Sequence, residues 1–216
     1  MMGSDRSERT KPIHKVELES FWITRFPVTQ DLYKWVMGKN PFYFRGKQRP
    51  VDQVDWYDGI EFCNALSKEM GLKAYYKIDR KKKDPNYERE SDTKKWLVEI
   101  NEDSKGYRLL REEEWEYAAR GGKLWRDQFL YSGRNQLNEV GWNRENSHEE
   151  SKEVGLKAPN QLGLYDMSGN VEEWCWDWYV AYNNRIKITY YRVVRGGSWD
   201  HENSICYVAY RYSFSP

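Results

Sequence analysis

The sequence predicts an α+β domain, and three features of its 216 residues carry that prediction. Two segments in the first third have the apolar spacing and the end residues of helices. A few short runs alternate between apolar and polar residues, as strands do. From about Gly122 to Val194 regular patterns are scarce, while Gly, Asn, Pro and Trp recur, which indicates long loops held by specific contacts. We expect residues 1–216 to form one domain.

The first helix is expected to follow a short apolar strand at residues 21–23. Thr29 can cap the start of this helix, and Val28 can pack onto Tyr33 one turn later. Gly38 is expected to end the helix, because glycine readily adopts the left-handed conformation found at helix ends.

A second helix and two strands come next. Asp55 can cap the helix and Gly71 ends it, while Cys63 lies on its apolar face and is expected to be a packed core thiol. The alternating runs at residues 75–78 and 95–100 indicate strands. We expect the charged segment between these strands to be a long hairpin loop.

A third helix is expected at residues 112–120, where Gly121 follows as its stop. The acidic first turn of this helix would complement the positive end of the helix dipole. Closing strands are expected at residues 190–194, 197–199 and 208–212.

Charge and hydropathy exclude several function classes. The formal net charge is only +1, so the chain has no strong field with which to hold nucleic acid. No run approaches the ~20 apolar residues that cross a bilayer. We expect membrane contact only through an N-terminal anchor that is absent from this chain, on a protein that is exported and located outside the cell or on its surface.

The core is expected to consist largely of aromatic rings. The chain has 11 Trp and 17 Tyr, although its mean hydropathy is -1.00. Such side chains bury large areas and carry a polar group at the edge, so they can stabilise a loop-rich domain with few aliphatic runs.

Four sequence blocks occur in the order that is typical of one family. They are residues 21–30, residues 107–109 with 114–122, residues 159–174, and residues 195–199. Together the blocks resemble the formylglycine-generating enzyme (sulfatase-modifying factor) family over essentially the whole chain. The resemblance implies an elaborated C-type lectin fold with a small twisted antiparallel sheet, two helices and long ordered loops.

The resemblance also raises an enzymatic alternative, a copper- or iron-dependent oxidase that acts on cysteine or other thiol substrates. In the oxidising members, two cysteines five positions apart bind copper(I), which prefers soft thiolates. Here the first of these positions is His201 and only the second, Cys206, is a cysteine. Iron-binding relatives use a histidine triad, but His14, His148 and His201 are far apart in the sequence. We therefore expect no enzymatic activity.

Calcium is the one cofactor that the resemblance suggests, and we expect none to be required. In some family members the turn at residues 169–174 holds this ion, and here Asn170 and Glu173 could supply oxygen ligands. The alternative is that both side chains bond to neighbouring loops without a metal.

One group with this fold lacks the copper cysteines, namely the variable proteins of diversity-generating retroelements. Their C-terminal block is rewritten by mutagenesis at adenines, which cannot produce Lys, Glu, Gln, Met or Trp from asparagine codons. Between Asp200 and Pro216 only Glu202 belongs to these five types. The resemblance therefore implies that residues 195–216 form a variable, ligand-binding segment.

Strand periodicity suggests which side chains of this segment face the ligand. The expected ligand-facing residues are Asp200, His201, Asn203, Ser204, Cys206, Tyr207, Ala209 and Tyr210. We expect Trp199, Val208 and Arg211 to be structural instead. The predicted function is that of a non-catalytic, receptor-like monomer that binds a protein or another macromolecule; a domain that kept the fold and no site is a further alternative.

Overall fold

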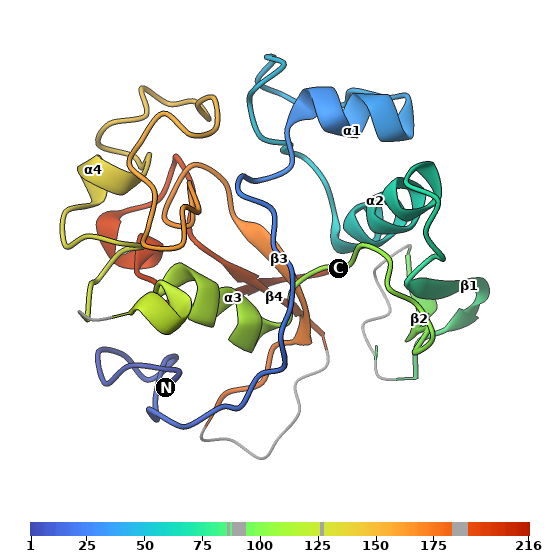
Figure 1. Cartoon of the computed structure of the whole chain (residues 1–216), viewed down its shortest axis with the longest axis horizontal. Coiled ribbons are helices and arrows are strands. Elements are labelled where there is room, and N and C mark those ends of the chain that lie inside the picture. The colour runs from blue at the N-terminus through green and yellow to red at the C-terminus, as the bar shows by residue number, and fades with distance from the viewer. Residues whose placement is uncertain (86, 88–93, 126–127, 183–189) are drawn as a thin grey trace.

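A computed structural model describes residues 1–85, 87, 94–125, 128–182 and 190–216 of the chain (Figure 1). The helices are α1 (Gln30–Met37), α2 (Trp56–Glu69), α3 (Glu112–Ala119) and α4 (Leu137–Val140), with short 3-10 helices η1 (Gly122–Leu124) and η2 (Asn203–Cys206). The strands are β1 (Tyr76–Lys83), β2 (Trp96–Ile100), β3 (Glu173–Trp178), β4 (Arg192–Arg195) and β5 (Tyr212–Phe214). The predicted α+β class is confirmed.

The strands form two small antiparallel sheets. β1 pairs with β2 in a hairpin, and β4 lies between β3 and β5 in the central sheet. Val194 is paired with Trp174 on one side and with Tyr212 on the other. The C-terminal strand is therefore the edge of the sheet that also carries β3.

Side-chain alternation along β3 joins two hydrophobic clusters, because successive strand residues point to opposite faces. Cys175 packs with Val193 and with Trp115 of α3. Its neighbours Trp174 and Trp176 pack with Trp56 of α2 instead. The central sheet thus lies between α3 and α2, and α3 is seen against the sheet in Figure 1.

The predicted helix ends are confirmed. The Thr29 hydroxyl accepts a hydrogen bond from the Leu32 amide, and Gly38 ends α1 with a φ of 71°. Asp55 and Asp58 form a reciprocal capping box at the start of α2. Cys63 is buried on the inner face of this helix, as expected.

Residues 21–23 lie in the described part of the chain and form no strand there, so that prediction was wrong. Phe21 and Ile23 pack onto the core, whereas the side chain between them, Trp22, is 99% exposed. The side chains of this run therefore alternate between the core and the solvent, as in a strand, but its backbone does not pair with a strand. The predicted loop between residues 78 and 95 is shorter than expected, because β1 continues to Lys83. Residues 86 and 88–93 of that loop lie outside the described residues.

The end of the chain also differs from the prediction. The expected strand at residues 197–199 is a turn, because Gly196 and Gly197 have φ values of 93° and 72° that a strand does not accommodate. The last strand begins at Tyr212, and a 3-10 helix precedes it. β3 was not predicted, although every second residue of its sequence EWCWDW is Trp, because it lies in the region from Gly122 to Val194 that was interpreted as long loops.

Within the described residues, none of the helices has the length and apolar character needed to cross a membrane.

Candidate ligand-binding surface

The segment between β4 and β5 runs over the surface of the domain beside α4, where η2 is drawn in red in Figure 1. Six of the eight residues expected to face a ligand are accessible there. Asp200 and Ser204 are exposed, and four others are half-buried: His201, Asn203, Tyr207 and Tyr210. We call these six residues the display positions.

The expectation was wrong for Cys206 and Ala209, which are 0% and 7% exposed. Cys206 belongs to η2 and packs in a cluster with Leu137 and Val140 of α4. Cys206 is the last residue of η2, and Ala209 lies in the turn that follows it. Neither residue therefore has the strand conformation from which its ligand-facing position was inferred. Val208 and Arg211 are buried, as was expected of structural residues.

The backbone at the start of this segment is held by groups outside it. The Trp199 amide donates a hydrogen bond of 2.9 Å to the Asn170 carbonyl. Arg144 donates from its side chain to the Asp200 carbonyl at 2.9 Å and from its amide to the His201 carbonyl at 3.0 Å. None of these bonds uses a side chain of a display position.

The backbone at the end of the segment is held in the same manner. The Val208 amide donates to the Leu130 carbonyl at 2.9 Å. The Arg195 guanidinium donates to the carbonyls of Val208, at 2.8 Å, and Ala209, at 3.4 Å. Arg195 is 1% exposed, so these bonds are shielded from water.

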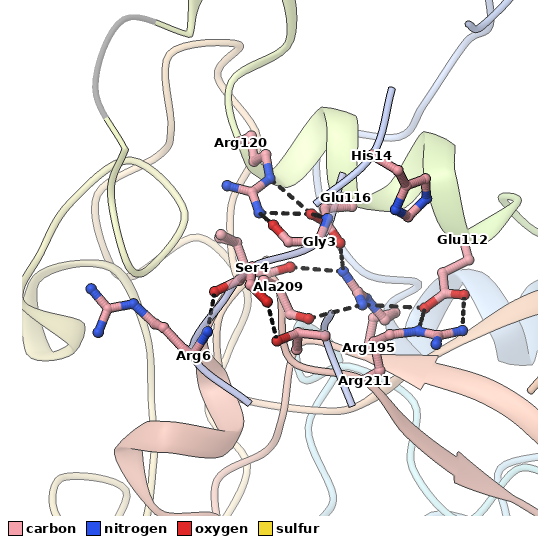
Figure 2. A network of polar contacts seen from close by, with 12 residues as sticks. Gly3, Ser4, Arg6, His14, Glu112, Glu116, Arg120, Arg195, Ala209 and Arg211 are labelled. Atoms are coloured by element: carbon pink, nitrogen blue, oxygen red, sulfur yellow. Dashed lines mark hydrogen bonds and ion pairs between the residues drawn. The ribbon is translucent and has the colours of Figure 1, made fainter. Parts of the chain in front are cut away.

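A buried ion-pair network holds Arg195 in turn (Figure 2). Its guanidinium reaches Glu116 at 2.5 Å and Glu112 at 3.2 Å, both on α3. Arg211 binds both oxygens of Glu112, at 2.6 and 2.7 Å, and Arg120 binds Glu116 at 2.7 Å. Sequence reasoning assigned the acidic residues of α3 to the helix dipole and missed this network.

Burial and the neighbouring arginines have opposite effects on the ionisation of Glu116. Burial opposes ionisation, but the guanidinium groups of Arg195 and Arg120 outweigh it and hold the pKa of the Glu116 carboxyl below its usual value. The carboxylate is therefore ionised at neutral pH and fixes the guanidinium that holds the tail backbone.

Side chains from other loops border the display positions, and sequence reasoning did not find them. The side-chain amide of Asn143 donates to the side-chain oxygen of Asn203 at 2.6 Å. The side-chain nitrogen of Asn203 lies 3.4 Å from the Glu145 carboxylate. The rings of Tyr131 and Tyr207 lie 5.2 Å apart. These contacts come from the long loop region, where no periodic pattern marks a residue as a neighbour of the tail.

The copper site of the oxidising relatives does not fit the residues present. Cys206 is the one thiol of the expected pair, and burial raises its pKa to about 12, so it is not a thiolate at neutral pH. His201, at the other position, has its ring nitrogen 3.2 Å from the Ser198 hydroxyl. Across the described ranges, no group of three or more His, Cys, Asp or Glu side chains could hold a metal ion. His14, His148 and His201 therefore do not come together as an iron-binding triad.

Asn170 and Glu173, the candidate calcium ligands, are engaged with the protein itself. The Asn170 side chain accepts from the Lys152 amide at 2.9 Å and donates to the Lys152 carbonyl at 3.0 Å. The Glu173 carboxyl accepts from the Trp115 indole at 3.1 Å. These contacts pin the loop through its own side chains, and calcium binding at Asn170 and Glu173 stays a prediction.

Because the carboxyls of Glu172 and Glu173 are shielded from water, we expect the stability of the domain to depend on pH near neutrality. Burial raises the pKa of both carboxyls to about 7, from 4.5. The folded chain therefore binds more protons than the unfolded chain between these values, and the free energy of unfolding is expected to decrease as the pH rises from about 5 to about 8. Urea denaturation across this range should show a smaller decrease for Glu173→Gln.

The exposed Glu153 supplies the matched control for this prediction. The variant Glu153→Gln should keep the pH dependence of the original chain. Equal slopes for Glu173→Gln and the original chain would show that the buried carboxyl does not titrate in this range.

Comparison with known proteins agrees with this geometry. The family model described as "Sulfatase-modifying factor enzyme 1-like domain" matches residues 1–216. A protein of Paenibacillus barcinonensis named "Chaperone protein LppX" is 41% identical over 216 residues, which cover 92% of this chain and 76% of that protein. The formylglycine-generating enzyme of Streptomyces coelicolor is 35% identical over 129 residues, which cover 47% of this chain and 38% of the enzyme.

A solved structure has a similar fold over the whole chain. The structure titled "Treponema denticola variable protein 1" has a TM-score of 0.85 and 33% sequence identity, and the match covers 100% of this chain and 86% of that one. The four sequence blocks predicted the family, and the missing copper cysteine with the composition of the C-terminal block predicted the likeness to a variable protein; both are confirmed. The chain thus belongs to the family of the sulfatase-modifying factor enzyme 1-like domain, which includes the formylglycine-generating enzymes.

Proposed function

We propose that this chain is a non-catalytic ligand-binding protein that presents residues 195–216 as an exchangeable surface on a C-type lectin scaffold. The variable proteins of diversity-generating retroelements work in this way, and the likeness to a variable protein supports the assignment. The partner is a protein or another macromolecule, bound by the monomer outside the cell or at its surface.

One observation carries the proposal: groups outside the display positions hold the backbone that bears them. Hydrogen bonds with the backbone carbonyls of Asn170 and Leu130 and with the side chains of Arg144 and Arg195 hold this backbone without using a display side chain. A surface of this kind can change its chemistry while its shape is kept, as in binding loops on rigid scaffolds.

The display positions suit macromolecular recognition. Tyr207 and Tyr210 provide large side chains with few rotatable bonds, and Asn203 and Ser204 provide adaptable hydrogen-bonding groups. All three cysteines of the chain are buried, which would protect their thiols in an oxidising medium.

Two pairs of tyrosine substitutions in the same segment test the proposal. Asp200→Tyr with Ser204→Tyr places rings at exposed positions and should change the free energy of unfolding by about 0.5 kcal/mol per site or less. Cys206→Tyr with Ala209→Tyr overfills buried positions and should lower it by about 1–3 kcal/mol per site. Urea denaturation measures both pairs. If the double variant Asp200→Tyr, Ser204→Tyr is unfolded, the proposal of an exchangeable surface is refuted.

Two further observations separate this function from that of an oxidase. Copper titration with oxygen uptake on a cysteine-containing peptide should show no turnover, and turnover that is lost in Cys206→Ala would overturn the proposal.

In the genome, a near-copy of the DNA for residues 195–216 should lie beside a reverse-transcriptase gene and differ only at adenines. A last block that is identical among close isolates would indicate a domain without a variable site.

A further inference from the structure

The N-terminal loop, residues 3–12, is docked onto the network that holds the tail (Figure 2). The Gly3 amide donates to Glu116 at 2.8 Å, and Arg120 donates to the Gly3 carbonyl at 2.9 Å. Met2 and His14 exchange backbone hydrogen bonds of 2.8 and 2.9 Å, which close the base of the loop. The loop is therefore fixed relative to α3 and, through Glu116, to Arg195.

The loop is also closed by its own contacts. The Ser4 amide donates to the Thr10 carbonyl at 2.9 Å, and the buried Thr10 hydroxyl donates to the Ser4 carbonyl at 2.8 Å. Gly3 has a φ of +89°, and a Cβ there would lie 2.6 Å from the Thr10 carbonyl oxygen, so only glycine permits this approach. The residues between Ser4 and Thr10 thus have a defined place.

This closure places two arginines beside the rings of the tail. The Arg6 guanidinium lies 5.9 Å from the ring centre of Tyr207, and that of Arg9 lies 5.5 Å from the ring centre of Tyr212. Both arginine side chains are exposed. Within the described ranges neither has a carboxylate partner, whereas Lys11 of the same loop is paired with Glu8 at 3.0 Å.

The opposite end of the display segment has the contrary arrangement. The acidic side chains of Asp200 and Glu202 lie 3.5 and 3.7 Å from Arg144, whose single positive charge they share. Among the described residues of this surface, the arginines without a carboxylate partner are thus located where the N-terminal loop meets the tyrosines.

An arginine next to a tyrosine ring is well suited to hold a carboxylate. The guanidinium presents a planar set of donors that matches two carboxylate oxygens, and the ring stabilises the cation from the side. Arginine and tyrosine are also among the residues that contribute most to protein interfaces. Arg6 and Arg9 lie outside residues 195–216, so they stay constant when the display positions change.

We propose that the N-terminal loop is a constant part of the binding surface, and that Arg6 and Arg9 select partners through an acidic segment of a protein. This inference rests on the proposed function. The exchangeable side chains would then refine a preference for carboxylates that the loop already imposes.

A labelled deca-glutamate peptide, followed by fluorescence anisotropy at low salt, tests this inference on the full chain. The double variant Arg6→Ala, Arg9→Ala should bind the peptide about tenfold more weakly than the original chain, which corresponds to two lost charge-assisted contacts of modest strength. The control Arg25→Ala, Arg45→Ala removes the same charge from exposed sites elsewhere and should weaken binding less than about twofold. Thermal denaturation should show that both variants remain folded.

Three results would overturn the inference. The original chain could fail to bind the peptide, the two double variants could lose affinity equally, or a heparin fragment could bind more tightly than the peptide in a manner that depends on Arg6 and Arg9. The urea denaturation of the variant Asp200→Tyr, Ser204→Tyr tests the proposed function without the peptide. A chain that tolerates them but does not bind deca-glutamate would refute only the role of the loop, whereas a chain that unfolds with them would refute the display surface itself.

Discussion

The variant Arg195→Met is expected to lose about 3–5 kcal/mol of its free energy of unfolding, because the substitution leaves two buried carboxylates without their common partner. Arg195 joins Glu112 and Glu116 of α3 to the backbone carbonyls of Val208 and Ala209. Methionine has a similar length and fills the space, but it offers neither charge nor donors. Urea denaturation monitored by tryptophan fluorescence measures the loss.

Arg134 provides the matched control, because its ion pair with Glu139 is exposed and spans 3.5 Å. The variant Arg134→Ala should lose less than about 1 kcal/mol, as is usual for surface pairs. Similar losses in the two variants would mean that the buried network does not hold the tail.

Replacement of Gly169 by alanine is expected to destabilise the domain by about 2–5 kcal/mol, the sum of backbone strain and overpacking. Gly169 has a φ of +83°, and a Cβ there would lie 2.2 Å from the carbonyl oxygen of Trp142. The Gly169 amide also donates to the Gly196 carbonyl at 2.8 Å, at the turn that leads into the display segment. Thermal and urea denaturation should both show the loss.

Gly163 separates the two causes of this effect. It has a φ of +77°, but a Cβ at that position would meet nothing within 4 Å. The variant Gly163→Ala should therefore show only the backbone strain of about 1–2 kcal/mol. A loss for Gly169→Ala no larger than that of Gly163→Ala would show that the Trp142 loop can move aside.

Local rules predicted the helices well, because their end residues act within a few positions. Thr29, Gly38 and Asp55 each form the cap that the sequence suggests. The same rules failed for the run at residues 21–23, since a strand needs a partner and sequence alternation does not reveal one. Trp22 shows the limit clearly, because its size suggests burial and its side chain is almost fully exposed.

The accessibility of the C-terminal segment was predicted in part, since six of its eight proposed ligand-facing positions are accessible. Cys206 and Ala209 were misplaced because a strand was expected where the chain forms a 3-10 helix and a turn. Contributions from Arg6, Arg144 and Asn143 could not be predicted, because they depend on loops that are distant in the sequence and carry no periodic signal.

The buried network also affects the order in which the chain can fold during synthesis. Glu112 and Glu116 leave the ribosome 83 and 79 residues ahead of Arg195, and Glu112 leaves it 99 residues ahead of Arg211. Until those arginines emerge, Glu116 has only Arg120 as a partner and Glu112 lacks both of its arginines, so the burial of α3 would carry a large electrostatic penalty. The nascent domain should therefore stay open until residues 195–216 arrive, so that the whole C-terminal segment is present when the core closes around it.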